Sequence, residues 1–198
     1  MKFHKLVKNV GGWDTLESET VFSNPYVEVR LEKVKTPTRP EGASWTIAHR
    51  KGATVVAPIT PDGRLVLVQQ ERIPIRANLW EFPAGQIDES SEHDEAILRA
   101  TALRELREEA GYDLGPKSEL IPMGHFFSSA GFMDEHSHLF AATNVVPAEG
   151  EFAPEESEAF TDCRAFSQEE FRAMIASGEI RDANTLSTFA RMIVLGVL

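Results

Sequence analysis

Apolar and polar residues alternate in several short runs over the first third of the chain, and a period of two is typical of half-buried strands. We interpret four runs as strands: 21–34, which alternates in its second part, then 44–49, 53–59 and 65–69. Because Pro61-Asp62-Gly63 separates the last two runs, they are expected to form a hairpin. The Pro-rich segment 36–42 (TPTRPEG) lies among the first strands. We interpret it as a boundary between a small N-terminal β unit and the rest of the chain.

The second half of the chain mixes helical and strand patterns. A helix is predicted over 91–110, strands follow near 120–127 and 137–146, and a last helix begins at about Thr185. Between them, Ser167 with Glu170 three residues later has the form of a capping box, and Gly178 ends that helix. Strands and helices mixed without a regular βαβ alternation favour an α+β architecture.

Composition and charge narrow the class of protein. A chain of 198 residues suits one ordinary core with a modest extension. Acidic residues outnumber basic ones 31 to 20, which argues against a nucleic-acid binder, because the phosphate backbone selects for clustered Lys and Arg. A single cysteine, Cys163, excludes an internal disulfide, and the N-terminus lacks the apolar run of a signal peptide. We therefore expect a cytoplasmic protein without a membrane span.

Three glutamates share one face of the predicted helix 91–110. At about 100° per residue, Glu105, Glu108 and Glu109 fall in one sector, and the alanine and leucine side chains lie opposite. Like charges at this spacing cost about 0.2–0.5 kcal/mol per pair, which a divalent cation converts into attraction. Carboxylate oxygens suit Mg²⁺ or Mn²⁺. The alternative is a solvated acidic helix face.

The residues around this helix add a recognisable pattern. Residues 104–112 read RELREEAGY, and Pro83-Ala84-Gly85 precedes the helix, where a glycine allows close backbone approach. Read together, these residues resemble the Nudix box, G-x5-E-x7-R-E-U-x-E-E-x-G-U, where U is a bulky apolar residue. The second half of the box matches at every fixed position, so the metal-site interpretation is favoured over the solvated face.

The first half of the box departs from the family pattern. Gly85 and Arg104 are nineteen positions apart where the family has fourteen, so about five residues are inserted around SSEHDE. The first box glutamate, which pairs with the box arginine, has Glu92 and Glu95 as candidates here. Ser91 with Asp94 has the form of an N-cap, which predicts that the insertion lengthens the helix by about one turn.

The resemblance implies a fold and a metal site. The fold is α+β, with a mixed β-sheet packed between helices as an α/β/α sandwich and a small N-terminal antiparallel β extension. It divides the chain into 1–48, expected to mediate dimerisation, and 49–198, the Nudix hydrolase domain. Glu105, Glu108 and Glu109 with the carbonyl of Ala84 would hold Mg²⁺, with Mn²⁺ as the alternative. Arg104 would hold the carboxylates in place.

Further segments resemble the ADP-ribose and ADP-sugar pyrophosphatase branch of this family. They are 66–89, 128–140 and 178–186, and the resemblance extends over roughly 20–190. In that branch a loop glutamate acts as general base or orients the water, and Glu135 matches it. Asp134, Glu156 and Glu158 are the alternative candidates for this catalytic carboxylate. The branch usually has proline where this chain has Ala130. This departure weakens the expectation that ADP-ribose is the substrate and leaves the expectation of a hydrolase unchanged.

Four residues match substrate-contacting positions of that branch. Arg72 would clamp the pyrophosphate, with an ion pair as the alternative, and Glu81 would lie near the substrate. Tyr26 and Trp45 would sandwich the base from an N-terminal unit that pairs two subunits, with packing on a β surface as the alternative. The partners implied are a nucleoside diphosphate sugar and a second copy of the chain. Alternatives in function are GDP-mannose or a dinucleotide as substrate, or a non-catalytic nucleotide-sugar sensor.

Overall fold

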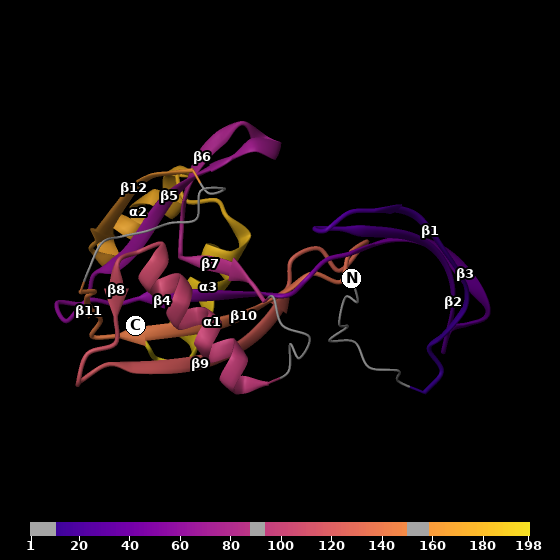
Figure 1. The fold of residues 1–198 in the computed structure, drawn as a ribbon, viewed down its shortest axis with the longest axis horizontal. Coiled ribbons are helices and arrows are strands. Elements are labelled where there is room, and N and C mark those ends of the chain that lie inside the picture. The colour runs from indigo at the N-terminus through magenta and orange to yellow at the C-terminus, as the bar shows by residue number, and fades with distance from the viewer. Residues whose placement is uncertain (1–10, 88–93, 150–158) are drawn as a thin grey trace.

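The computed structural model describes residues 11–87, 94–149 and 159–198. Its body is a stack of sheets and helices, and a curved N-terminal sheet stands at one end of the long axis (Figure 1). The predicted N-terminal antiparallel β extension is therefore present. Within the described residues, none of the helices is long and apolar enough to cross a membrane.

The N-terminal sheet has three antiparallel strands, β1 (Asp14–Ser23), β2 (Glu28–Thr36) and β3 (Arg39–His49), in that order. The alternating second part of the run 21–34 lies in β2, and a turn separates this strand from β1. The Asn24 side chain accepts the backbone N–H groups of Tyr26 and Val27, each at 2.8 Å, and this bonding stabilises the turn.

The Pro-rich segment 36–42 is not a boundary, and that interpretation is wrong. Thr36 pairs with Arg39, so the segment forms the β2–β3 turn and the beginning of β3 inside the N-terminal sheet. Because β3 is an edge strand, Pro40 is tolerated there without a ladder hydrogen bond.

The body contains two main sheets. A four-stranded mixed sheet has the order β7-β4-β10-β9, and a three-stranded antiparallel sheet has the order β12-β5-β6. In the first sheet β10 pairs in parallel with β4 and antiparallel with β9, and β7 pairs antiparallel with β4. The bounds are β4 (Ala53–Pro58), β5 (Leu65–Arg72), β6 (Ala77–Glu81), β7 (Ala84–Gln86), β9 (Glu119–Phe127), β10 (His136–Thr143) and β12 (Phe160–Phe166). Two short strands, β8 (Tyr112–Asp113) and β11 (Val146–Pro147), pair beside them.

Helices cover both faces of the mixed sheet. On one face, Val56 of β4 packs in a cluster with Leu98 and Leu106 of α1 (Glu95–Glu108). On the other face, Val55 belongs to the larger cluster with residues of α2 (Gln168–Ser177) and α3 (Ala183–Val194). Neighbouring residues of β4 thus point to opposite helical layers, as the strand period requires. The predicted α/β/α sandwich is confirmed.

Helix ends follow local capping chemistry. The capping box at the start of α2 is confirmed, because the Ser167 hydroxyl accepts the Glu170 N–H at 3.2 Å and the Glu170 carboxylate accepts the Ser167 N–H at 2.7 Å. At α1 the predicted N-cap, Ser91, lies outside the described residues. The Asp94 carboxylate accepts the Ala96 N–H at 2.9 Å and caps the helix, which begins at Glu95. Asp is as good an N-cap as Ser, and the residues after it are good helix formers.

Candidate active site

Glu105 of α1 and Glu109, the C-cap residue of that helix, are buried against strand β7. Glu105 is 5% exposed and Glu109 is 2% exposed. The backbone N–H of Ala84 donates to Glu109 Oε2 at 2.9 Å. At Gly85 any Cβ atom would collide with the Glu105 carboxylate, so glycine is required for this close approach. The segment 83–85 and the end of α1 therefore form one unit, although Gly85 and Glu105 are 20 positions apart in the sequence.

Arg104 lies beside two of the box carboxylates, Glu105 and Glu108. Its Nη2 lies 2.7 Å from Glu105 Oε1, and its Nη1 lies 3.9 Å from Glu108 Oε2. The Glu108 side chain is half-buried, unlike its two neighbours in the box. The structure thus brings Arg104 beside the carboxylates, as the resemblance implied. Glu95, one candidate for the first box glutamate, has its Oε1 3.6 Å from Arg99 Nη1. The other candidate, Glu92, lies outside the described residues.

The end of α1 accounts for the box glycine. Gly111 has φ of 70°, the left-handed region that glycine adopts without strain, and its N–H donates to the Arg107 carbonyl at 3.1 Å. The chain can therefore leave the helix directly after Glu109 and Ala110.

The carboxylates fit a hard divalent cation that shares its shell with substrate and water. Among residues 11–87, 94–149 and 159–198, no group of three or more His, Cys, Asp or Glu side chains is arranged so that it could hold a metal ion. Mg²⁺, however, is commonly held by only one or two carboxylates, with water and phosphate oxygens completing the octahedron. Glu105 and Glu109 are two buried carboxylates beside β7, and burying such charges is costly unless a cation or hydrogen bonds compensate them. The donor set is therefore that of a hard divalent cation.

Arg72 and Glu81 form a bidentate ion pair across the β5–β6 hairpin. Arg72 Nε donates to Glu81 Oε1 at 2.8 Å, and Nη2 donates to Oε2 at 2.5 Å. Glu81 is 2% exposed, and its burial raises the pKa of its carboxyl group, an effect that Arg72 partly opposes. The ion pair that was the alternative for Arg72 is present. The pair joins two residues that were predicted separately to lie near substrate.

Glu135 lies in the loop between β9 and β10 and is held on both sides. Its Oε1 lies 2.8 Å from Arg50 Nη1, and its Oε2 accepts the Ser128 hydroxyl at 2.7 Å. The Oδ2 atom of the neighbouring Asp134 lies 2.6 Å from His49 Nδ1. Sequence reasoning missed the roles of His49, Arg50 and Ser128. A signal was present in the basic run His49-Arg50-Lys51 at the end of a predicted strand. The alternative candidates Glu156 and Glu158 lie outside the described residues.

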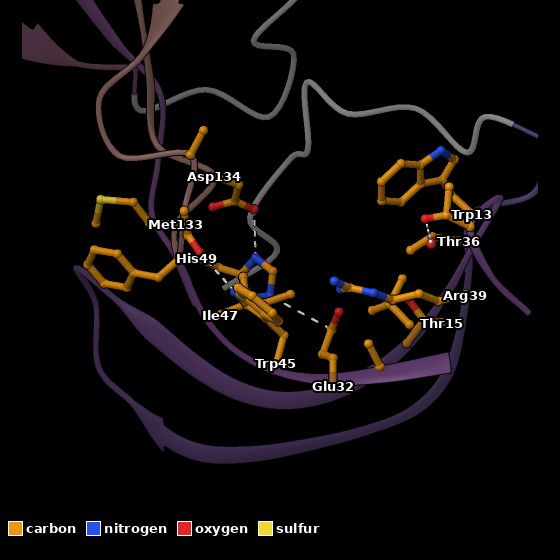
Figure 2. Close-up of a pocket in the computed structure, with 16 residues that line it drawn as sticks. Trp13, Thr15, Glu32, Thr36, Arg39, Trp45, Ile47, His49, Met133 and Asp134 are labelled. Carbon is orange, nitrogen blue, oxygen red and sulfur yellow. Dashed lines mark hydrogen bonds and ion pairs between the residues drawn. The ribbon is translucent and has the colours of Figure 1, made fainter. Parts of the chain in front are cut away.

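A pocket of about 620 Å³ opens between the concave face of the N-terminal sheet and the loop 130–134. Trp13 and Trp45 line it together with Glu32, Arg39 and His49 (Figure 2). Trp45 is half exposed, and its Nε1 donates to the Gly131 carbonyl at 2.8 Å. Sequence reasoning missed Trp13.

The pocket takes in only part of the predicted site. Tyr26, 65% exposed, lies in the β1–β2 turn and not in the lining of this pocket. The described box glutamates, Arg72, Glu81 and Glu135 also lie outside the lining. Asp134 does line the pocket, and it is adjacent to Glu135 in the loop. The carboxylate site of Glu105 and Glu109 and the pocket lined by Trp13 and Trp45, the aromatic pocket, are thus two separate features.

Comparison with known proteins agrees with the geometry. The family model described as NUDIX domain matches residues 48–189. An ADP-ribose pyrophosphatase of Bacillus subtilis (strain 168) is 30% identical over 171 residues, 86% of this chain and 87% of that protein. A methanol dehydrogenase activator of Bacillus methanolicus is 31% identical over 172 residues, covering 87% and 88%. A GDP-mannose pyrophosphatase of Yersinia enterocolitica is 30% identical over 161 residues, covering 74% and 75%.

A solved structure supports the fold. It is described as the crystal structure of an ADP compounds hydrolase, and it superposes with a TM-score of 0.73 over 96% of both chains. The sequence identity is 16%, so this likeness concerns the arrangement of the elements.

Proposed function

Since the chain belongs to the Nudix hydrolase family, we propose that it hydrolyses the pyrophosphate bond of an ADP-sugar, with ADP-ribose as the first candidate, giving AMP and a sugar phosphate. The observation that carries the proposal is the pair Glu105 and Glu109, buried against the glycine at position 85. Two relatives with names of this kind, an ADP-ribose and a GDP-mannose pyrophosphatase, support a nucleotide-sugar substrate.

Glu105, Glu109 and the carbonyl of Ala84 would hold Mg²⁺ or Mn²⁺, with Glu108 as a further ligand or a partner of bound water. A divalent cation supplies a water of lowered pKa and neutralises charge on the phosphate oxygens. Arg104, 2.7 Å from Glu105, fixes the direction of that carboxylate. The buried position of Glu109 and its hydrogen bond from Ala84 fix the other.

Glu135 would take or orient the proton of the attacking water. Its carboxylate is about one-fifth exposed, so water reaches it, while Arg50 and Ser128 limit its rotation. A general base needs this combination of access and fixed direction. Glu135 comes from a loop and the metal ligands come from a helix, so the arrangement of the base relative to the ligands depends on how that loop is held.

The remaining contacts would bind the rest of the substrate. Arg72 could exchange part of its pairing with Glu81 for a phosphate oxygen, because a guanidinium has five donors. Trp45 would stack on the base, a contact that tolerates different bases and gives affinity more than discrimination. We assign Tyr26 the same role only from a second subunit, since it lies outside this pocket in its own chain.

We include a homodimer in the proposal, with residues 1–48 as the dimerisation unit and 49–198 as the hydrolase domain. The support is the exposure of large apolar side chains on the N-terminal sheet. These are Leu16, Val21, Phe22 and Leu31. All ten residues of β1 are exposed in the single chain. Such a surface is typical of an interface. We also keep the cytoplasmic location expected from the sequence.

A hydrolysis screen tests the function. ADP-ribose, ADP-glucose, GDP-mannose, NADH and diadenosine polyphosphates are compared with and without Mg²⁺, and the products are identified. The alternative of GDP-mannose is favoured by the Yersinia relative, and AMP or GMP among the products separates the two. Absence of hydrolysis with every compound, together with tight binding of one of them, would instead indicate a sensor.

Glu109→Gln tests whether the activity depends on the carboxylate site. The amide can still accept the Ala84 N–H, so the fold should be retained, but one ligand charge is lost. Turnover is expected to fall by roughly 10²–10⁴-fold, in the range of other losses of transition-state stabilisation. Glu119→Gln, an exposed acid on β9, is the matched control. Turnover of Glu109→Gln within threefold of the parent would contradict the site.

A further inference from the structure

The end of β3 makes a series of contacts with the loop that carries Glu135. The Ala48 N–H donates to the Phe132 carbonyl at 2.9 Å, and the Ala48 carbonyl accepts the Asp134 N–H at 3.3 Å. Ala48 also forms a parallel bridge with Met133. The N-terminal sheet therefore contacts the loop through backbone pairing as well as through Trp45.

A buried histidine makes the central side-chain contact of this junction. His49 is 2% exposed, and its Nδ1 lies 2.6 Å from Asp134 Oδ2 (Figure 2). Its Nε2 faces Glu32 Oε1 of β2 at 3.9 Å, and Glu32 is itself 4% exposed. The imidazole thus lies between a carboxylate of the N-terminal sheet and a carboxylate of the loop.

The second oxygen of Asp134 is held as well. The Arg50 backbone N–H donates to Asp134 Oδ1 at 3.2 Å. Two consecutive residues, His49 and Arg50, therefore bind Asp134, and the Arg50 side chain binds Glu135. Because both Asp134 oxygens are engaged at the junction, Asp134 suits a positioning role better than that of a base.

We propose that His49, acting through Asp134, is a positioning residue that holds the loop 128–135 so that Glu135 points at the attacking water. The inference rests on the proposed function, in which Glu135 is the base. Loops carry catalytic groups less rigidly than helices do, so a second layer of hydrogen bonds is needed to fix the base. A displacement of about 1 Å in a catalytic group can cost about 100-fold in rate.

The first experiment measures kcat and KM for ADP-ribose with Mg²⁺ in His49→Ala, His49→Asn and His49→Gln. His49→Ala should lower kcat by about 10–100-fold and leave KM within about threefold. The asparagine amide reaches the place of Nδ1 and the glutamine amide reaches that of Nε2. His49→Asn should therefore retain more turnover than His49→Gln, and this comparison remains informative if His49→Ala does not fold. Equal turnover in His49→Asn and His49→Gln would overturn the role of the Asp134 contact.

A double-mutant cycle with Glu135→Gln asks whether His49 acts through Glu135. If it does, His49→Ala should lower kcat by less than about twofold in the Glu135→Gln background, because the group that it positions is already lost. Two losses that multiply in full would overturn the proposal. Parent-like turnover of Glu135→Gln alone would instead show that the base assignment of the proposed function is wrong.

Hydrogen exchange measured by mass spectrometry needs no substrate and tests the junction directly. His49→Ala should raise exchange in segment 128–135 at least tenfold and leave α2 and α3 at the parent rate. Unchanged exchange in that segment would overturn the proposal. Glu17→Gln is the matched control, since it removes an ion pair with Lys33 (Oε1–Nζ 3.6 Å) that lies within the N-terminal sheet and outside the lining of the pocket. It should change neither kcat nor the exchange of 128–135.

Discussion

The contact between Gly85 and Glu105 shows how a single residue limits the geometry of the site. The glutamate carboxylate occupies the space in which any side chain at position 85 would begin. The same carboxylate forms an ion pair with Arg104, so moving it aside would also disturb that contact. The glycine therefore determines where this proposed metal ligand lies.

Gly85→Ala should consequently lower activity although it adds one methyl group. The Cβ atom must displace the Glu105 carboxylate, and we expect turnover to fall by about 10–100-fold. Because a proposed metal ligand is displaced, the Mg²⁺ concentration that gives the half-maximal rate should rise. Steady-state rates across a Mg²⁺ titration measure both effects. Gly11→Ala, where a Cβ atom meets nothing within 4 Å, should behave as the parent. Parent-like rates at every Mg²⁺ concentration would contradict the role of Gly85.

Trp45 is the aromatic residue for which binding and packing roles can be separated. Trp45→Ala should raise KM for ADP-ribose by about 5–100-fold, because stacking contributes about 1–3 kcal/mol per base and involves a non-reacting part of the ligand. Trp45→Phe keeps a ring and loses only the hydrogen bond to Gly131, so it should lie nearer the parent. An unchanged KM in Trp45→Ala would favour packing on the β surface.

At the scale of elements, features that depend on neighbouring residues were predictable. The capping box of α2 and the tight turn at residues 61–63 follow from residues within a few positions of each other. The hairpin predicted for 53–59 and 65–69 is wrong, because β4 and β5 lie in different sheets and only an isolated bridge between Ile59 and Leu65 joins their ends. The box helix and its acidic face follow from a period of 3.6 and a family pattern. The turn at Asn24 and the cap at Asp94 were missed because more than one nearby polar residue can serve as the breaker or the cap.

Contacts between distant segments were not predictable from the sequence. His49 and Asp134 are 85 positions apart, and no period or spacing relates them. The parallel pairing of β4 with β10 brings the ends of β3 and of the loop to the same place. The pocket depends on the curvature of the N-terminal sheet, which strand patterns do not specify.

The capping box gives α2 a stability that depends on pH. Hydrogen bonds from Ser167 lower the pKa of Glu170 below its ordinary value of 4.5. A carboxyl group with a lowered folded-state pKa stabilises the fold above its unfolded pKa, and this contribution is lost as the pH falls through the folded value. In urea unfolding, the parent should exceed Glu170→Gln in stability at pH 7, and the difference should shrink below pH 4.5 and be lost as the pH falls through the lowered folded-state pKa. Glu169→Gln in the same turn is the control. A difference that is constant with pH would contradict this account.

At the scale of the whole molecule, the N-terminal sheet leaves apolar surface that the single chain does not cover. Phe22 on the edge strand β1 is 53% exposed. If this surface joins two chains, sedimentation should show a dimer, and Phe22→Glu should raise the dissociation constant at least tenfold because a charge would be buried in the interface. Val194→Glu, at an exposed apolar site on α3, should leave the dimer intact. A monomeric parent at micromolar concentration would contradict the proposed dimer.

The aromatic pocket is lined by two different parts of the chain, and this affects how the molecule unfolds. The N-terminal sheet forms one side of this pocket and the loop 130–134 forms the other. A ligand that contacts both sides binds only while the two parts are joined, so local detachment of the sheet would require release of the ligand. At a concentration 100 times its dissociation constant such a ligand contributes about 2.7 kcal/mol against that detachment. Occupancy of the pocket would thus increase the cooperativity of thermal unfolding, and the sheet and the body would melt together as one thermodynamic unit.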